Sequence, residues 1–314
     1  MTHAQLAKGT SVASSGSGES PHPLSRVLGA GRPMVCGILN VTPDSFSDGG
    51  LFDTLERAVE HGRRLAAEGA DLLDIGGEST RPGSRPPTLA EELDRVVPVV
   101  EALGRRIPVP LSVDTSRPEV MRAAVAAGAS MINDVRALRA PGALEATAEL
   151  RVPVCLMHMQ RSPETMQHDP RYRDVVAEVG AFLAERKRAC LDAGIRPEHL
   201  LVDPGFGFGK TLSHNVTLLA SLGRLRSLGV PIMVGLSRKS MLGQLTGRAV
   251  GDRLPASLAA AVIAAQRGAA VVRVHDVAAT RDALAVLDAV SAVSSGLRPL
   301  PGASLSDAPS QGPP

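Results

Sequence analysis

Residues 109–134 read "VPLSVDTSRPEVMRAAVAAGASMIND", and this stretch contains the unit from which most of the chain is built. The apolar run "VPLSVD" is typical of a buried strand, and the alanine-rich segment after it is typical of an amphipathic helix. That segment ends at Gly128, a residue that favours the left-handed conformation of a helix stop, and the apolar run "SMIND" follows at once. This order predicts a strand–helix–strand unit of a parallel sheet.

The same alternation recurs from Met34 to about Ser291. The apolar runs predicted to be strands are "MVCGILN" from Met34, "DLLDIG" from Asp71, "VPLSVD" from Val109, "SMIND" from Ser130, "VPVCLMH" from Val152, "LLVDPG" from Leu200, "PIMVGLS" from Pro231 and "AVVRVHD" from Ala270. Glycines that end the intervening helical segments are Gly69, Gly128, Gly194, Gly229 and Gly268. Eight such units predict a closed (β/α)8 TIM barrel, because open doubly wound sheets usually have fewer strands.

One domain is expected, spanning residues 31–294, between two tails. Residues 1–30 are rich in Ser and Gly, and residues 295–314 are rich in Pro and Ser. Segments of this composition bury too little apolar surface to fold, so both tails are expected to be flexible.

The composition excludes several classes of function. The chain has 314 residues, of which 44% are hydrophobic, and a formal net charge of only +2. Nucleic-acid binding requires a clustered basic surface, so no DNA or RNA partner is expected. No apolar stretch approaches the ~20 residues that cross a bilayer, and no signal-peptide segment is apparent, so a soluble protein without membrane association is expected. An odd number of cysteines fits a reducing cytoplasm.

Each predicted strand ends in a polar residue, and the active site of a TIM barrel lies at the carboxyl ends of its strands. These residues are Asn40, Asp74, Asp114, Asn133, His158, Asp203, Ser237, and Arg273 with His275. A single polar residue at a strand end is usually structural, because loops are solvated. Polar residues at all eight ends predict that most of them face one cleft.

The charges of these residues indicate what the cleft binds. The hydrogen-bonding group that suits a planar ring with adjacent N–H groups consists of Asp114, Asn133 and Asp203. The cationic group that suits an anion such as diphosphate consists of Lys239, Arg273 and His275. A substrate that joins a ring to a diphosphate would satisfy both groups. The alternative is that Asp114 merely pairs with one of the cations.

Four of the five phenylalanines lie in or beside predicted loops that follow strands: Phe46, Phe52, Phe206 and Phe208. A flat ligand ring packing against them would explain such bulk, and a loop packing onto the barrel is the alternative for each. Two lie in "DPGFGFGKT", residues 203–211, whose final Gly-Lys-Thr is typical of a phosphate-binding loop. Pro204 occupies the first glycine position of that motif and has no amide hydrogen, which excludes a nucleotide hydrolase.

The loops as a set resemble those of the dihydropteroate synthase family. The matching stretches are "GILNVTPDSFSDGG" at 37–50, "DIGGESTRPG" at 74–83, "SVDT" at 112–115, "IND" at 132–134, "MHMQ" at 157–160, "DPGFGFGK" at 203–210, "GLSRKS" at 235–240 and "RVHDV" at 273–277. Eight ordered motifs between Met34 and about Val290 make the resemblance highly specific.

The resemblance implies a (β/α)8 barrel that joins 4-aminobenzoate to 6-hydroxymethyl-7,8-dihydropterin diphosphate and releases diphosphate, a transferase step of folate biosynthesis. It further implies small-molecule substrates, Mg2+ as cofactor, a homodimer, and a site at which sulfonamides act. The dimer is expected from the family alone, and the apolar faces of the later helices are only compatible with it.

The resemblance also assigns residues by position. The pterin site would comprise Asp114, Asn133, Met157, Asp203, Lys239 and Arg273. The aminobenzoate site would comprise Phe46, Thr80, Arg81, Pro82, Phe208 and Ser240. The catalytic residues would be Asn40, Asp48, Lys239, Arg273 and His275, with Asn40 also a ligand of Mg2+. In this scheme Arg273 and His275 stabilise the departing diphosphate, and Asp48 assists the attacking amine.

One residue departs from the family pattern, and two other functions are conceivable on the same barrel. Arg161 follows "MHMQ" where the family often has glycine, which leaves the conformation of this loop open. A pterin-dependent methyltransferase would share the ring-binding acceptors but would not need "STRPG" and "SRKS", which are both present. A non-catalytic relative that binds pterin or a partner protein would be expected to have damaged motifs, and none is damaged.

Overall fold

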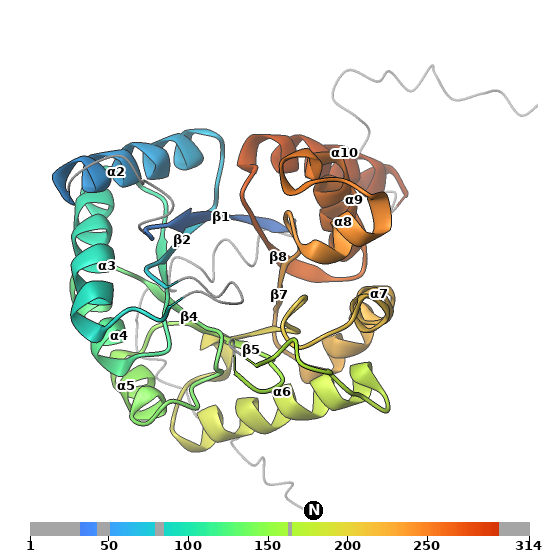
Figure 1. Cartoon of the computed structure of the whole chain (residues 1–314), viewed down its shortest axis with the longest axis horizontal. Coiled ribbons are helices and arrows are strands. Elements are labelled where there is room, and N and C mark those ends of the chain that lie inside the picture. Colours follow the sequence, from blue (N-terminus) through green and yellow to red (C-terminus); the bar gives the residue numbers. More distant parts are fainter. Residues whose placement is uncertain (1–31, 43–50, 79–84, 163–164, 295–314) are drawn as a thin grey trace, which may run out of the picture.

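The chain folds into a closed barrel of parallel strands, which confirms the predicted fold class (Figure 1). In the computed structural model the described residues are 32–42, 51–78, 85–162 and 165–294, with the backbone alone for 51–54. The strands are β1 (Met34–Asn40), β2 (Leu72–Gly76), β3 (Leu111–Asp114), β4 (Met131–Asp134), β5 (Val154–Met157), β6 (Leu200–Asp203), β7 (Ile232–Gly235) and β8 (Ala269–Val274). Each overlaps the apolar run predicted for it.

Most strands are shorter than the predicted runs, and three of them begin directly after a proline. These prolines are Pro110, Pro153 and Pro231. Because proline has no amide hydrogen, it cannot donate to the strand ladder. Each of the three instead uses only its carbonyl, which accepts a hydrogen bond from a neighbouring strand.

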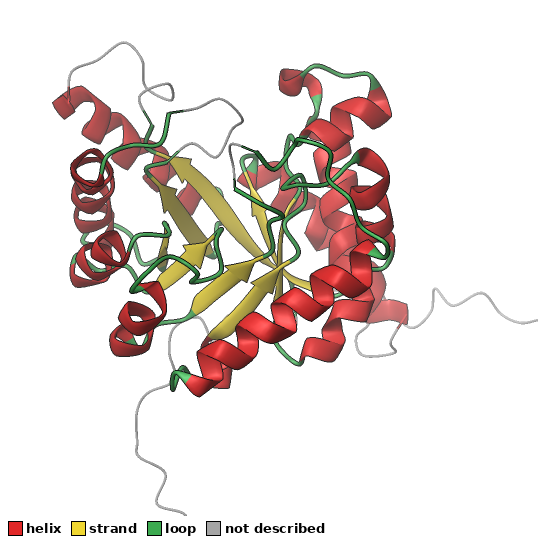
Figure 2. Cartoon of the chain, turned by 60° about the horizontal axis from the view of Figure 1, so that its bottom comes forward, coloured by secondary structure: helices red, strands yellow, loops and turns green. Residues whose placement is uncertain are grey.

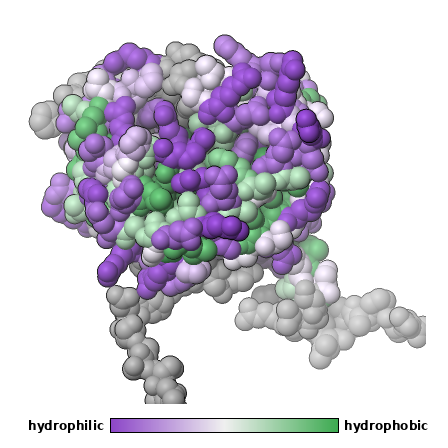
Figure 3. Space-filling view, turned by 90° about the horizontal axis from the view of Figure 1, so that it is seen from below, coloured by the Kyte–Doolittle hydropathy of each residue, from purple (hydrophilic) through white to green (hydrophobic). Residues whose placement is uncertain are grey.

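The helices surround the barrel (Figure 2). The α-helices are α2 (Leu51–Ala67), α3 (Leu89–Gly104), α4 (Pro118–Ala126), α5 (Ala143–Leu150), α6 (Val175–Asp192), α7 (Leu212–Ala220), α8 (Ser240–Thr246), α9 (Leu254–Gln266) and α10 (Val277–Ser294). The short 3-10 helices are η2 (Pro197–His199), η3 (Leu222–Leu228) and η4 (Val250–Asp252). In the described part of the chain, no helix is long and apolar enough to cross a membrane. Hydrophilic residues cover most of the face shown in Figure 3, with hydrophobic patches between them.

Local sequence signals account for where several helices begin and end. Thr88 and Glu91 form a capping box at the start of α3, and the Asp174 side chain accepts hydrogen bonds from two amides in the first turn of α6. Such caps satisfy amides that have no partner inside the helix. The predicted stop glycines all have positive φ values: Gly69, Gly128, Gly194, Gly229 and Gly268.

The barrel closes where β1 pairs with β8. Met34 lies opposite Val271 on that side, and Cys36 lies opposite Leu72 on β2. The interior is filled at this level by a layer of apolar side chains: Met34, Cys36, Leu72, Met131, Cys155, Leu201, Met233 and Val271. Among the described residues the barrel is therefore packed below its mouth, which leaves the carboxyl ends of the strands as the expected place of a ligand site.

The inward-facing positions change character one step further along the strands. Side chains two residues apart on a strand point to the same side of the sheet. On six of the strands, the residues two positions after members of the apolar layer are Asp74, Asn133, Met157, Asp203, Gly235 and Arg273, whereas on β1 the apolar Ile38 follows Cys36. Alternation along the strands thus brings charged and amide groups together at the mouth. The domain bounds remain a prediction, since residues 1–31 and 295–314 lie outside the described residues.

Candidate active site

Arg273 on β8 is the centre of a network that joins three other strands at the mouth of the barrel, two of them through its own hydrogen bonds. Its Nε donates a hydrogen bond to Oδ2 of Asp74 at 2.6 Å, and its Nη2 donates to Oδ2 of Asp114 at 2.9 Å. Asn133 Nδ2 donates to the same Asp74 oxygen at 2.9 Å. The predicted residues Asp114, Asn133 and Arg273 therefore belong to one network. Asp114 forms an ion pair with Arg273, and its predicted contact with a ligand ring stays a prediction.

The network places two carboxylates around one cation, and these charges shift the pKa values of Asp114 and Arg273. Burial raises the pKa of the Asp114 carboxyl, and the charge of Asp74 adds to the rise, although Arg273 lowers it. Burial lowers the pKa of the Arg273 guanidinium, but Asp74 and Asp114 outweigh this effect and hold that pKa above its ordinary value. Arg273 therefore remains charged at and around neutral pH.

Asp74 is the central residue of this network, and the sequence analysis placed it at a strand end without assigning it to the site. Its side chain is 1% exposed and accepts from both Arg273 and Asn133 through one oxygen. Its other oxygen, Oδ1, is buried and has no hydrogen-bond partner among the described residues. The sequence did contain a signal that Asp74 points into the barrel mouth: it lies two residues after Leu72, whose side chain faces the barrel interior.

Asp203 and Lys239 form a second pair of opposite charges at the mouth. Asp203 ends β6, is 6% exposed, and accepts a hydrogen bond from the Gly205 amide at 2.7 Å. Burial raises the pKa of the Asp203 carboxyl, while Lys239 and the Gly205 amide lower it. Burial also lowers the pKa of Lys239 to about 8, against the opposite effect of Asp203. Each charge thus offsets part of the desolvation of the other.

The side chain of Lys239, which directly precedes α8, packs against the loop between β6 and α7. Its Nζ donates a hydrogen bond to the Phe206 carbonyl and lies 4.6 Å from the centroid of the Phe208 ring. A cation over an aromatic face at this distance is attracted to the ring. Phe208 is half-buried and packs with Met157 against the remaining members of a small apolar cluster, Met159, Met166 and Val135. This cluster gives the mouth an apolar wall beside its charges.

The remaining predicted residues on β1 and β8 lie on adjacent strands. Asn40 ends β1 and is partly buried, and β1 pairs with β8. His275 follows β8, and its Nδ1 lies 3.0 Å from the hydroxyl of Ser237, which follows β7. Asn40, Arg273 and His275 are thus brought to one side of the mouth by strand order.

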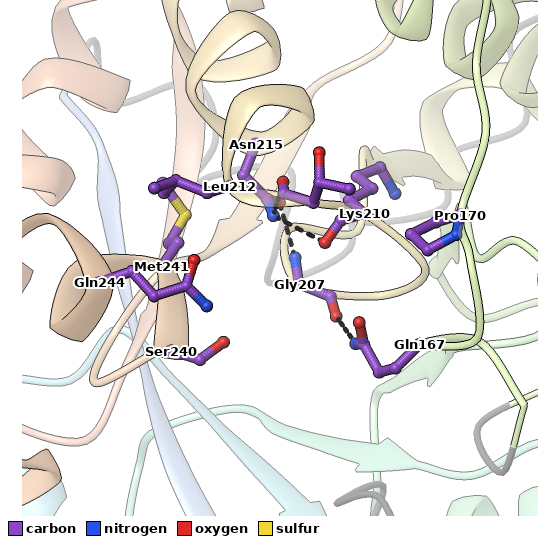
Figure 4. A pocket seen from close by; sticks show the side chains of 10 residues that line it. Gln167, Pro170, Gly207, Lys210, Leu212, Asn215, Ser240, Met241 and Gln244 are labelled. Carbon is purple, nitrogen blue, oxygen red and sulfur yellow. Dashed lines mark hydrogen bonds between the residues drawn. The ribbon is translucent and has the colours of Figure 1, made fainter.

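Ser240 lies at the start of α8, beside a cavity of about 290 Å3 (Figure 4). The residues that line the cavity are Gln167, Pro170, Gly207, Lys210, Thr211, Leu212, Asn215, Ser240, Met241 and Gln244. The cavity is bounded by the loops after β5 and β6 and by the first turns of α7 and α8. Ser240 and the loop that contains Phe208 therefore border one space.

Five predicted site residues lie outside the described residues: Phe46, Asp48, Thr80, Arg81 and Pro82. The side chain of Phe52 also lies outside them. The positions predicted for these residues stay predictions.

Two strand-end or loop residues do not face the mouth. Phe206 is fully buried in the main core, so the interpretation of this ring as part of a ligand surface is wrong, and the alternative that the loop packs onto the barrel is correct. His158 is 6% exposed, and its ring packs edge-on against the ring of Phe182 on α6, with the two ring centroids 5.0 Å apart. Because His158 directly follows the inward-facing Met157, alternation turns it outward.

Arg161, which departs from the family pattern, adopts a left-handed backbone conformation with φ of 65°. Glycine takes this conformation without cost, whereas other residues are strained there by about 1 kcal/mol. The Arg161 side chain donates a hydrogen bond to the His168 carbonyl at 2.5 Å, which links two positions within the loop after β5. This contact offsets part of the strain, and the residue lies away from the charged network.

The chain is similar to known proteins over most of its length. Residues 36–275 match the family described as pterin binding enzyme. Dihydropteroate synthase of Escherichia coli (strain K12) is 55% identical over 262 residues, which cover 83% of this chain and 93% of that protein. The structure of Xanthomonas albilineans dihydropteroate synthase with 4-aminobenzoic acid matches with a TM-score of 0.80 and 63% identity, covering 83% of this chain and 94% of that one.

A second structure of the Xanthomonas albilineans enzyme, in complex with 7,8-dihydropteroate, matches with a TM-score of 0.77 and 60% identity. It covers 83% of this chain and 95% of that chain. The family match, the high identities and the shared barrel agree with the eight sequence motifs. The chain therefore belongs to the dihydropteroate synthase family of pterin-binding enzymes.

Proposed function

We propose that this chain condenses 6-hydroxymethyl-7,8-dihydropterin diphosphate with 4-aminobenzoate to give 7,8-dihydropteroate and diphosphate. The observation that carries the proposal is the charged network at the barrel mouth, in which Arg273 bridges Asp74 and Asp114 and the Asp203–Lys239 pair lies at the same rim. Family membership supplies the substrates, and the network supplies groups that fit them.

The pterin ring binds among the acidic and amide groups. Its adjacent N–H groups are donors, and the carboxylates of Asp114 and Asp203 and the amide of Asn133 accept from them. Met157 provides an apolar surface for the pterin ring. The cationic groups of Lys239 and Arg273 also contact the ring. A buried carboxylate pairs strongly with such donors, because leaving it unpaired costs several kcal/mol.

The reaction proceeds by departure of diphosphate before the amine attacks. The bond between the pterin methylene carbon and the diphosphate oxygen breaks, and its electron pair leaves with the diphosphate. Arg273 and His275 stabilise the developing negative charge, and the nearby carboxylates stabilise the cationic methylene. The aniline nitrogen then bonds to that carbon and loses a proton, with assistance from Asp48. The site holds the two rings together and excludes water, so no covalent nucleophile is needed.

Mg2+ is the cofactor that we propose for the diphosphate end. In the parts of the chain that the structure describes, no three or more His, Cys, Asp or Glu side chains form a metal cluster. Mg2+ does not require one, because it keeps several waters and is held by one or two protein oxygens together with substrate phosphates. The amide oxygen of Asn40 is a suitable ligand, so the donor set fits. Bound Mg2+ would neutralise charge on the departing diphosphate.

Removal of divalent cations is expected to lower the rate by at least about tenfold, because the diphosphate would leave without part of its charge compensation. The measurement is the initial rate after treatment with a chelator, followed by addition of Mg2+ or, as a control, of Ca2+. Full activity in the chelated sample would contradict the assignment of a metal. The Asn40→Ala variant should require more Mg2+ for half-maximal rate.

The aminobenzoate would bind on the outer side of the pterin. The residues proposed for this site are Phe46, Thr80, Arg81, Pro82, Phe208 and Ser240. Ser240 lines the cavity together with Gly207, which directly precedes Phe208 in the loop after β6, and this supports the proposal. Sulfonamides, which carry an aniline as aminobenzoate does, would compete for the same place.

Replacing Ser240 by alanine is expected to raise KM for 4-aminobenzoate about tenfold, because a hydroxyl that binds a carboxylate is lost. The affinity for the pterin diphosphate should stay within twofold. Steady-state kinetics with each substrate varied in turn separates the two effects. Gln244→Ala, at the same cavity, is the matched control. An equal loss of both affinities in Ser240→Ala would rule out a specific aminobenzoate contact.

A homodimer is proposed through the face formed by α8, α9 and α10, which lie side by side in Figure 1. Large hydrophobic side chains exposed on these helices and on η4 are Leu245, Val250, Leu254, Ile263, Val286, Val290 and Val293. Apolar side chains gathered in this way are typical of interaction surfaces. Light scattering of the purified chain should give twice the chain mass, and a monomer at micromolar concentration would contradict the proposal.

A cytoplasmic location is also proposed. Cys36, Cys155 and Cys190 are all free and buried, as expected in a reducing compartment. Cell fractionation that recovered the chain with an oxidising compartment would overturn this proposal.

A further inference from the structure

Lys210, the last residue of "DPGFGFGK", has a buried ammonium group to which the proposed reaction gives no role. Lys210 as a whole is only 4% exposed. The Nζ atom donates to the carbonyls of Gly205 at 2.9 Å and Phe208 at 3.0 Å and lies 3.0 Å from Nδ1 of His158. An ammonium has three N–H donors, so all three are engaged by these neighbours.

The state of His158 fits this arrangement. Burial lowers the pKa of the His158 imidazole to about 3, and the charge of Lys210 adds to the effect. The ring is therefore neutral, and its Nδ1 accepts from Lys210. Burial also lowers the pKa of Lys210 to about 7, while the charge of Asp203 raises it. A lysine buried without a hydrogen-bonded carboxylate among the described residues is costly, so its contacts need an explanation.

These contacts belong to a loop whose consecutive carbonyls are all held by side chains. The pairs are Gly205 and Phe208 with Lys210, Phe206 with Lys239, Gly207 with Gln167, and Gly209 with Tyr172. Figure 4 shows Gly207 between Gln167 and Asn215. At Gly205, where φ is +68°, an added Cβ would lie 1.9 Å from the His158 carbonyl oxygen, so the backbone is pressed against that strand end.

The loop in turn holds Lys239. The Lys239 ammonium donates to the Phe206 carbonyl and lies over the Phe208 ring, and its side chain passes 3.3 Å from the position of an added Cβ at Gly207. Phe206 lies between the two carbonyls that Lys210 holds. Movement of those carbonyls would therefore move the acceptor of Lys239 and the ring beneath it.

We propose that Lys210 is a positioning residue: by fixing the carbonyls of Gly205 and Phe208, it sets the places of Lys239 and Phe208 for the pterin ring. The inference rests on the proposed function. Lys210 is not among the residues assigned above to the pterin ring or to the diphosphate. Its influence should be confined to the ring end of the mouth, because Asn40 ends β1 and His275 follows β8, whereas Lys210 belongs to the loop after β6.

This confinement gives a test that a general structural defect would not pass. Calorimetric titration would compare the Lys210→Met variant with the wild type for two probes, 6-hydroxymethylpterin and inorganic diphosphate with Mg2+. Misplacement of a binding group by about 1 Å costs roughly 10- to 100-fold, so the variant should lose at least tenfold in affinity for the pterin. Its affinity for diphosphate should stay within twofold of the wild type.

The matched control is Tyr172→Phe, which removes one hydrogen bond from the same loop at Gly209 and should change pterin affinity less than twofold. If Lys210→Met does not fold, Lys210→Gln, which retains two donors, is titrated with the same probes and should show a smaller but measurable loss for the pterin alone. Unchanged pterin affinity, or an equal loss for both probes, would overturn the inference. A folded wild type that bound neither probe would instead overturn the proposed function.

Discussion

The Asp203→Ala variant is expected to lose binding of 6-hydroxymethyl-7,8-dihydropterin diphosphate, with affinity falling by at least about 100-fold because hydrogen bonds to a charged acceptor are removed. Because Asp203 is only 6% exposed, water cannot fully replace its carboxylate. Its loss would also leave the Gly205 amide without an acceptor. Calorimetric titration of the variant with the substrate measures the effect directly.

The control for this variant is Asp203→Asn, which keeps the shape of the side chain and an oxygen for the Gly205 amide but removes the negative charge. Its affinity should lie between those of the wild type and Asp203→Ala. Circular dichroism and thermal unfolding would show that both variants are folded. Unchanged affinity in a folded Asp203→Ala protein would remove Asp203 from the pterin site.

Replacing Arg273 by methionine is expected to lower kcat/KM by at least about 1,000-fold, because a preorganised cation near the departing diphosphate is lost. The same change should lower the free energy of unfolding by about 3–5 kcal/mol, since it leaves the carboxylates of Asp74 and Asp114 without their cation. Steady-state kinetics and urea unfolding measure the two effects. A kcat/KM within tenfold of the wild type would exclude Arg273 from the reaction.

Two further variants separate catalysis from stability. Arg273→Lys keeps the charge but lacks the fork that reaches Asp74 through Nε and Asp114 through Nη2, so its kcat/KM should remain well below that of the wild type. Combining Arg273→Met with Asp74→Asn removes one of the two unpaired charges and leaves the proposed pterin acceptor Asp114 in place. The double variant should recover part of the stability without recovering activity, which a purely structural role for Arg273 would not produce.

The sequence was sufficient to predict the barrel because its signals are local and repeated. Each strand and helix is encoded by its own apolar period, and the stop glycines lie where the backbone has positive φ. The polar rim followed from one general property of TIM barrels, the position of the site at the carboxyl ends of strands. The bounds of the strands were less well predicted. Prolines such as Pro153 extend an apolar run in the sequence, but the strand begins only after them because proline cannot donate a hydrogen bond to the ladder.

The internal arrangement of the site depends on contacts across the barrel, which local patterns do not contain. Asp74 and Arg273 are 199 residues apart in the chain and belong to strands that both flank β1, so their ion pair could not be read from either motif. Phe206 and Phe208 are two residues apart in one loop, yet the first is fully buried in the core and the second borders the mouth. Their difference arises from how the loop packs.

His158 illustrates a case in which a local rule was available. Alternation along β5 places Met157 inward and therefore turns His158 outward, toward α6 and Lys210. Because His158 is polar and lies at a strand end, it was expected at the mouth, but its odd spacing from the inward-facing Met157 already indicated that it points outward. The even spacing of Asp74 from the inward-facing Leu72 likewise indicates that Asp74 points into the site.

The most direct test of the account is formation of product by the purified chain. With 6-hydroxymethyl-7,8-dihydropterin diphosphate, labelled 4-aminobenzoate and Mg2+, the wild type should form 7,8-dihydropteroate and diphosphate in equal amounts, whereas a folded Asp203→Ala protein should form neither above background. Absence of 7,8-dihydropteroate with the folded wild type, or an equal rate in Asp203→Ala, would contradict the claim that the mouth of this barrel performs the condensation.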